Sequence, residues 1–287
     1  MKILIPTDFS KDAKHAIDYM YLSQLANVLN AEIELLYVYD PIVTQNNLPF
    51  PLISDVIAGA VKDAEEQLTI LCDEISTNTG LRCTSLVMTG IAVEEILKEA
   101  EAYKADMIVM GTKGASGIER ILFGSNTASV IEKATCPVLA VPKGATITLP
   151  KRIVFATNYH DSDMTTLKSL ASLAKTLDAE LMIVHVSKDN LRSERDLIEQ
   201  FSKAVAEETR FKQPFYYVME HTDVEKGLDH FVNSAGADLI ALSTRKRSVF
   251  EKLFDSSLTK KMAYHIKIPL LAFHETVSEK DSEDGDF

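Results

Sequence analysis

The sequence predicts an α/β chain made of two similar halves, each a five-stranded parallel sheet with helices on both faces. Two observations support this fold class. First, short apolar runs alternate with longer amphipathic stretches along the whole chain, as in strand–helix–strand units joined by right-handed crossovers. Second, the same elements occur twice in the same order, which indicates a duplicated domain.

The duplication is visible in two pairs of segments. The first pair is KILIPTDFSKDAKHAI (Lys2–Ile17) and RIVFATNYHDSDMTTL (Arg152–Leu167), which lie 150 positions apart; the second is ADMIVMGTKGAS (Ala105–Ser116) and ADLIALSTRKRS (Ala237–Ser248), which lie 132 apart. The second copy is therefore shorter by 150 − 132 = 18 residues. Most of the difference falls at Asp40–Ser54, whose three prolines predict an extended loop.

Each strand is predicted from a short run that is apolar throughout, since strands covered on both faces do not alternate with polar residues. In the first half these runs are Lys2–Pro6, Ile33–Tyr39, Thr84–Met88, Asp106–Met110 and Pro137–Val141. In the second half they are Arg152–Ala156, Glu180–Val186, Phe215–Met219, Asp238–Leu242 and Pro269–Phe273. Helices are predicted between the strands of the first half at Ser10–Leu29, Ser54–Thr79, Ala92–Tyr103 and Ser125–Lys133.

These elements divide the chain into four parts. We expect a first domain at residues 1–143, a linker at 144–150, a second domain at 151–274 and a tail at 275–287. The linker begins at Gly144 and ends at Pro150, as turn-rich connections do. The tail has six acidic residues and one lysine without apolar periodicity, which predicts disorder.

Composition excludes several classes of protein. The net charge of −12 argues against nucleic-acid binding, because the affinity for phosphate backbones comes from Lys and Arg. Three cysteines without CxxC spacing favour a reducing compartment over a disulfide framework. The chain starts without the layout of a signal peptide, and its apolar runs are too short to span a membrane. We therefore expect a cytoplasmic protein with no membrane and no nucleic-acid partner.

Two segments follow strands at the edge where open parallel sheets bind ligands. One is Pro6–Thr7–Asp8, and the other is the loop Gly111–Thr127 with its four glycines. Glycines in such a loop can simply form an ordinary turn. They also allow close approach to a ligand, and their backbone N–H groups can surround an anion. With Ser125 at a helix start, where free N–H groups favour phosphate, we expect phosphate binding.

Two charged residues in these segments have alternative roles. Asp8 could cap the helix that starts near Ser10, or it could bind a ribose hydroxyl or a metal ion beside phosphates. Lys113 could add a positive charge to the site or simply be solvated.

The loop also fits the pattern G-x2-G-x9-G-[ST], as Gly111, Gly114, Gly124 and Ser125. That pattern, the opening ILIPTDFS and the ending CPVLAVP resemble the universal stress protein family. Because the resemblance covers both halves, the chain resembles a tandem two-domain member with two Rossmann-like domains.

The resemblance implies the ligand and the residues that bind it. The ligand would be ATP, or ADP or AMP, in some relatives with Mg²⁺ or Mn²⁺. Asp8, beside Pro6 and Thr7, would contact the ribose or adenine side, and Val38 would line the adenine pocket. The phosphates would be wrapped by the backbone at three glycines and bound from the helix start, by Gly111, Gly114, Gly124, Ser125, Asn126 and Thr127.

The family resemblance also implies pairing of domains through their last strands, here Val138–Val141 against Leu270–Phe273. Whether the chain forms a homodimer, and which protein partner it has, stays open.

The second half departs from the pattern at its key positions. Asn158 replaces Asp8, and Ala156 replaces Pro6. The three glycines become Ser243, Lys246 and Ser256, although Ser257 and Thr259 keep the hydroxyl positions. Arg245, Lys246 and Arg247 could bind another anion or pair with acidic groups. His185 could line a vestigial pocket. We expect this half to have lost ATP binding and to act as the structural partner of the first.

Three functions follow as hypotheses. The leading one is an ATP-binding stress regulator with one competent site. The second is slow ATP hydrolysis, for which Asp8 is the only obvious general base. The third is a nucleotide-free scaffold that acts through protein partners.

Overall fold

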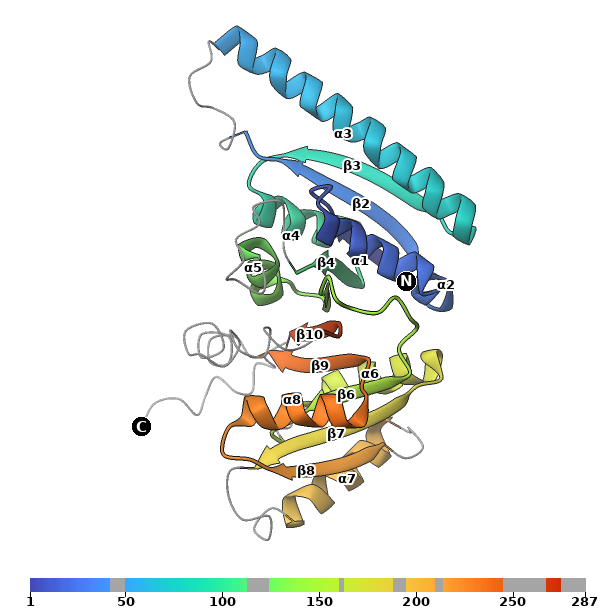
Figure 1. Ribbon diagram of the computed structural model, residues 1–287, viewed down its shortest axis with the longest axis vertical. Helices are drawn as coiled ribbons and strands as arrows, with labels where there is room; N and C mark the ends of the chain where they lie inside the picture. The colour runs from blue at the N-terminus through green and yellow to red at the C-terminus, as the bar shows by residue number, and fades with distance from the viewer. Residues whose placement is uncertain are drawn as a thin grey trace.

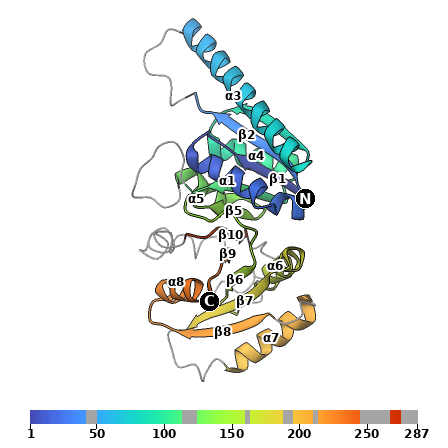
Figure 2. The same ribbon diagram turned by 45° about the vertical axis from the view of Figure 1, so that its right-hand side comes forward.

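The computed structural model describes residues 1–41, 50–112, 124–159, 163–187, 195–209, 214–244 and 267–274. These residues form one ten-stranded sheet in the order β3-β2-β1-β4-β5-β10-β9-β6-β7-β8. The two halves are stacked end to end along the long axis of the molecule (Figures 1 and 2). Each half contributes five parallel strands, so the predicted fold class is confirmed.

The strands lie close to the predicted runs. In the first half they are β1 (Lys2–Pro6), β2 (Glu32–Tyr39), β3 (Cys83–Thr89), β4 (Met107–Gly111) and β5 (Val138–Val141). In the second half they are β6 (Arg152–Ala156), β7 (Glu180–Ser187), β8 (Phe215–Glu220), β9 (Leu239–Thr244) and β10 (Leu270–His274).

The described helices are α1 (Lys11–Leu22), α2 (Leu25–Val28), α3 (Phe50–Thr79), α4 (Ala92–Tyr103), α5 (Ser125–Lys133), α6 (Asp163–Leu177), α7 (Arg195–Thr209) and α8 (Val224–Ala235). Helices α4 and α5 have the predicted bounds. None of the helices in the described part of the chain combines the length and apolar character needed to cross a bilayer.

Two predicted elements were wrong in extent. The expected single helix over Ser10–Leu29 is two helices, because Gln24 takes a left-handed conformation (φ 67°) between them. The expected extended loop over Asp40–Ser54 ends early, because α3 already begins at Phe50. Pro51 is compatible with this start, since the first turn of a helix needs no N–H donor at that position.

The halves meet where β5 and β10 pair antiparallel, as the family resemblance implied. Leu271 lies opposite Leu139, with Leu270 opposite Ala140 and Ala272 opposite Val138. On one face a single apolar core runs across both halves and includes residues of α1, α3, α6 and α7. On the other face, α4 and α5 cover one core and α8 covers another.

Candidate functional site

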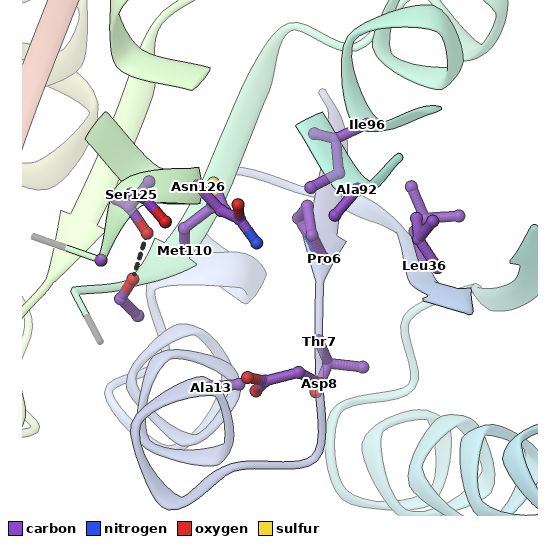
Figure 3. Close-up of a pocket in the computed structure, with 14 residues that line it drawn as sticks. Pro6, Thr7, Asp8, Ala13, Leu36, Ala92, Ile96, Met110, Ser125 and Asn126 are labelled. Carbon is purple, nitrogen blue, oxygen red and sulfur yellow. Dashed lines mark hydrogen bonds between the residues drawn. The ribbon is translucent and has the colours of Figure 1, made fainter. Parts of the chain in front are cut away.

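A cleft opens beyond the carboxyl ends of β1, β2 and β4, between α1, α4 and α5 (Figure 3). It has about 670 Å³ of empty space and is open to solvent. It is lined by Pro6, Thr7, Asp8, Ala13, Leu36, Val38, Ala92, Ile96, Met110, Gly111, Gly124, Ser125, Asn126 and Thr127. Nine of the ten predicted site residues are therefore brought together here. The tenth, Gly114, lies outside the described residues, as do Lys113 and Gly117.

The turn between β1 and α1 forms one side of the cleft. Ser10, and not Asp8, caps α1: its hydroxyl accepts a hydrogen bond from the N–H of Ala13 (3.2 Å). Asp8 is exposed, and one of its carboxylate oxygens accepts the N–H of Ser10 (3.0 Å). The Thr7 hydroxyl accepts the N–H of Phe9 (3.1 Å). Local hydrogen bonds thus hold this turn, and the Asp8 carboxylate lies at the cleft.

The start of α5 forms the opposite side. Gly124 is its N-cap, and no side chain of the described residues caps this end. The backbone N–H of Gly124 donates to the carbonyl of Thr112. Ser125 and Asn126 are exposed in the first turn. Because the first N–H groups of a helix have no intrahelical acceptor, this end favours an anion.

Gly111 and Thr127 have structural roles that the sequence did not indicate. A Cβ on Gly111 would lie 2.5 Å from the carbonyl oxygen of Asp12, so this glycine lets β4 approach the backbone of α1. Buried Thr127 donates its hydroxyl to the carbonyl of Gly111 (2.8 Å), the dashed line in Figure 3. Thr127 therefore positions α5 against β4, and its hydroxyl hydrogen is already used.

An apolar wall completes the cleft, and most of it was missed from the sequence. Beside the predicted Pro6 and Val38, the wall contains Ala13, Leu36, Ala92, Ile96 and Met110. For two of these residues, the spacing in the sequence could have indicated a place in the wall. Leu36 is two positions before Val38 and so shares its face of the strand, and Ile96 is four positions after Ala92 on the same helix face.

Metal ligands are sparse in this region. Asp8 is the only acidic side chain among the described residues that line the cleft. The described part of the chain contains no group of three His, Cys, Asp or Glu side chains that could hold a metal ion.

Comparison with known proteins identifies the family. The family model described as "Universal stress protein family" matches residues 1–142 and again residues 150–274. The chain belongs to the universal stress protein family. The two matches correspond to the two halves of the sheet.

Curated universal stress proteins match about half of this chain. Universal stress protein MJ0531 of Methanocaldococcus jannaschii is 37% identical over 148 residues, which cover 50% of this chain and 82% of the relative. Universal stress protein MJ0577 of the same organism is 32% identical over 156 residues, covering 50% and 94%. The crystal structure of a universal stress protein from Archaeoglobus fulgidus has a TM-score of 0.75 and 21% identity and covers 96% of both chains, so the whole two-domain fold is shared.

The second universal stress protein domain has different side chains at the positions equivalent to those that line the cleft. Asp163 stands where the first half has Ala13; it is buried and accepts a hydrogen bond from the Thr157 hydroxyl (2.6 Å). Val224 stands where the first half has Ala92. A buried carboxylate disfavours a phosphate nearby, and valine has a larger side chain than alanine. The predicted Ser256, Ser257, Thr259 and Arg245–Arg247 lie outside the described residues.

His185 does not share the face of Val184 and Val186, where the expected vestigial pocket would lie. Its ring packs on Tyr159 with centroids 4.6 Å apart, and its Nδ1 lies 2.8 Å from the carbonyl oxygen of Thr157. Val184 and Val186 flank it in β7 and belong to the core under α8. Because side chains alternate along a strand, His185 faces the other side of the sheet.

Proposed function

We propose that the cleft of the first domain (1–143) binds ATP, and that the protein is a cytoplasmic stress-response regulator with this single competent site. The observation that supports this most is the convergence of nine predicted residues on one cleft. In this proposal the second domain (151–274), joined by the linker 144–150, is a structural partner that does not bind nucleotide.

The two sides of the cleft suit the two ends of a nucleotide. The wall of Val38, Leu36 and Ile96 offers apolar surface for an adenine ring. The uncapped start of α5 offers N–H donors for phosphates, with Ser125 beside them. Asp8 accepts hydrogen bonds, as a ribose hydroxyl requires. Mg²⁺ or Mn²⁺ would have to bind mainly through the phosphates and Asp8.

Regulation is favoured over hydrolysis by the chemistry of the lining. Asp8 is the only titratable side chain among the described residues of the cleft, and it already accepts the N–H of Ser10. A general base needs to be within reach of an attacking water, and no second candidate lies there among these residues. Nucleotide would then act through different affinities for two states of the protein or of a partner complex.

The binding experiment compares matched positions in the two halves. Titration calorimetry of ATP, ADP and AMP is performed on the wild type, Asp8→Ala and Asn158→Ala. Loss of a hydrogen bond to a charged group costs roughly 1.5–3 kcal/mol, so Asp8→Ala should weaken binding about 10- to 100-fold. Asn158→Ala should bind like the wild type. Because Ser10 caps α1 independently, the fold should persist in Asp8→Ala.

Three results would contradict the proposal. Equal affinity of Asp8→Ala and the wild type would remove Asp8 from the site. Absence of binding to the wild type, with no nucleotide found by mass spectrometry of the denatured purified protein, would favour the scaffold. Rapid ADP formation under single-turnover conditions would favour the enzyme.

A further inference from the structure

Two cysteines that are not close in sequence meet on one side of the first domain. Cys72 lies near the end of α3, and Cys83 is the first residue of β3. The chain reverses direction between them through Gly80, which takes a left-handed conformation (φ 71°). The two sulfur atoms are 2.6 Å apart. A disulfide bond is ~2.05 Å long, so the two side chains already point at one another across the helix–strand contact.

The surroundings of this pair favour redox chemistry over metal binding. The carbonyl oxygen of Thr84 lies 3.2 Å from the sulfur of Cys72 and 3.8 Å from that of Cys83. No third metal-ligating side chain joins the two thiols among the described residues. A structural zinc site would need four such ligands.

One of the two thiols is the better nucleophile, and the other is the more exposed. The hydrogen bond between the two thiols lowers the pKa of Cys72, whereas the same hydrogen bond, together with burial, raises the pKa of Cys83. Cys72 therefore carries more thiolate, the reactive form. Cys72 itself is buried, whereas Cys83 is half-buried and lies on β3, the edge strand of the sheet, so a small oxidant would approach the pair from the Cys83 side.

We propose that Cys72 and Cys83 are a reversible oxidation site that forms an intramolecular disulfide with a peroxide as the oxidant. The thiolate of one cysteine attacks a peroxide oxygen; the S–O bond forms, the O–O bond breaks, and one water leaves after protonation when the peroxide is H₂O₂. The second thiol then attacks the sulfenic sulfur; the S–S bond forms, the S–O bond breaks, and a second water leaves. Two electrons and two protons pass from the dithiol to the peroxide, and a thiol reductant reverses the change.

The third cysteine serves as an internal comparison. Burial raises the pKa of Cys136 to about 11. This residue packs against the separate core that α4 and α5 cover. It should therefore react slowly. Disulfides in a reducing compartment are mostly transient and redox-sensing, so this site agrees with the cytoplasmic location that the composition predicts.

The disulfide bond would attach α3 covalently to the sheet and so stabilise the folded state. It would join α3 to the edge strand β3 and close a short loop around Gly80. Closing a loop in the unfolded chain raises the stability of the folded state. We therefore expect oxidation to raise the melting temperature by several degrees, and reduction to restore the original value.

The experiment uses the full-length wild type, so no variant is needed to detect the bond. The reduced protein is treated with H₂O₂, blocked with N-ethylmaleimide and digested with trypsin. Cleavage after Arg82 separates the two cysteines, placing Cys72 in peptide 63–82 and Cys83 in peptide 83–98. We expect these two peptides to be linked, with a loss of two hydrogens, while Cys136 in peptide 134–143 stays labelled by N-ethylmaleimide.

The controls separate the proposed bond from general oxidation. Cys136→Ser should keep both the linked peptides and the thermal shift, whereas Cys72→Ser and Cys83→Ser should lose both. Labelling of all three cysteines after H₂O₂ treatment would overturn the proposal, as would Cys136 appearing in the linked species. A linked pair in the wild type that dithiothreitol cannot reduce would contradict its reversibility.

Discussion

Gly111 and Asp12 touch backbone to backbone: a Cβ built on Gly111 would lie 2.5 Å from the carbonyl oxygen of Asp12. The contact brings the end of β4 against the first turn of α1, which carries the Asp8 turn ahead of it. Two sides of the cleft are thus held at a spacing that no other residue type permits.

Gly111→Ala should therefore destabilise the protein. The added methyl meets backbone and cannot be relieved by a rotamer change, and overpacking of this kind costs about 1–3 kcal/mol. Gly144→Ala is the matched control, since its nearest atom would be 3.9 Å away. Urea unfolding of both variants measures the difference. Equal midpoints for the two would show that β4 can move away from α1.

The half-buried Glu34 on β2 should make stability depend on pH. Burial, together with the nearby charge of Glu99, raises the pKa of Glu34 from 4.5 to about 7. Its Oε1 atom is buried without a hydrogen-bond partner. The folded state therefore holds a proton that the unfolded state releases, so the stability from this group is full below pH 4.5 and is lost as the pH rises towards 7.

Comparison of Glu34→Gln with the wild type tests this. The midpoint of urea unfolding should fall less between pH 4.5 and pH 8 in Glu34→Gln than in the wild type. Glu99→Gln should reduce the fall in part, because it removes one of the causes. A wild-type profile unchanged in Glu34→Gln would contradict the assignment.

The junction between the halves should be energetically coupled. Leu139 and Leu271 lie directly opposite one another in the antiparallel pair and are 3% and 1% exposed. Each change to Ala should cost about 2–5 kcal/mol. Because facing side chains in a sheet interact, the double variant should differ from additivity by at least about 0.5 kcal/mol.

The control for this cycle pairs Leu139→Ala with Leu181→Ala. Leu181 is on β7, four strands from β5, so about 19 Å separates them at ~4.8 Å per strand. That pair should be additive. Additivity of Leu139 and Leu271 as well would mean that the two halves are stabilised independently.

His274 at the end of β10 should add to the same junction. Its Nε2 atom lies 2.8 Å from the carbonyl oxygen of Ile131 in α5, a bond between the two halves. His274→Ala should cost about 1 kcal/mol, the net value of one such hydrogen bond. Thermal unfolding measures the loss, with exposed His230→Ala expected to be neutral.

Most strands could be predicted from the sequence because a strand buried on both faces needs a short run of apolar residues, which is visible locally. Runs such as Lys2–Pro6 and Arg152–Ala156 coincide with β1 and β6. The break in Ser10–Leu29 could not be predicted in this way. It depends on the left-handed Gln24, and no glycine or proline marks it in the sequence.

The sequence by itself determined the duplication and the fold class, and it pointed to the segments Pro6–Asp8 and Gly111–Thr127, because a repeat and the positions that follow strands are properties of order along the chain. The places of Val38 and Asn126 at the cleft were implied by the family resemblance. The tertiary structure alone decided that Gly111 packs on Asp12, that Thr127 gives its hydroxyl to Gly111, and that Cys72 meets Cys83. The physical reason is that these are contacts between side chains and backbones from different elements. The distances between these groups depend on how the helices pack against the sheet. A local pattern of residues does not determine that packing.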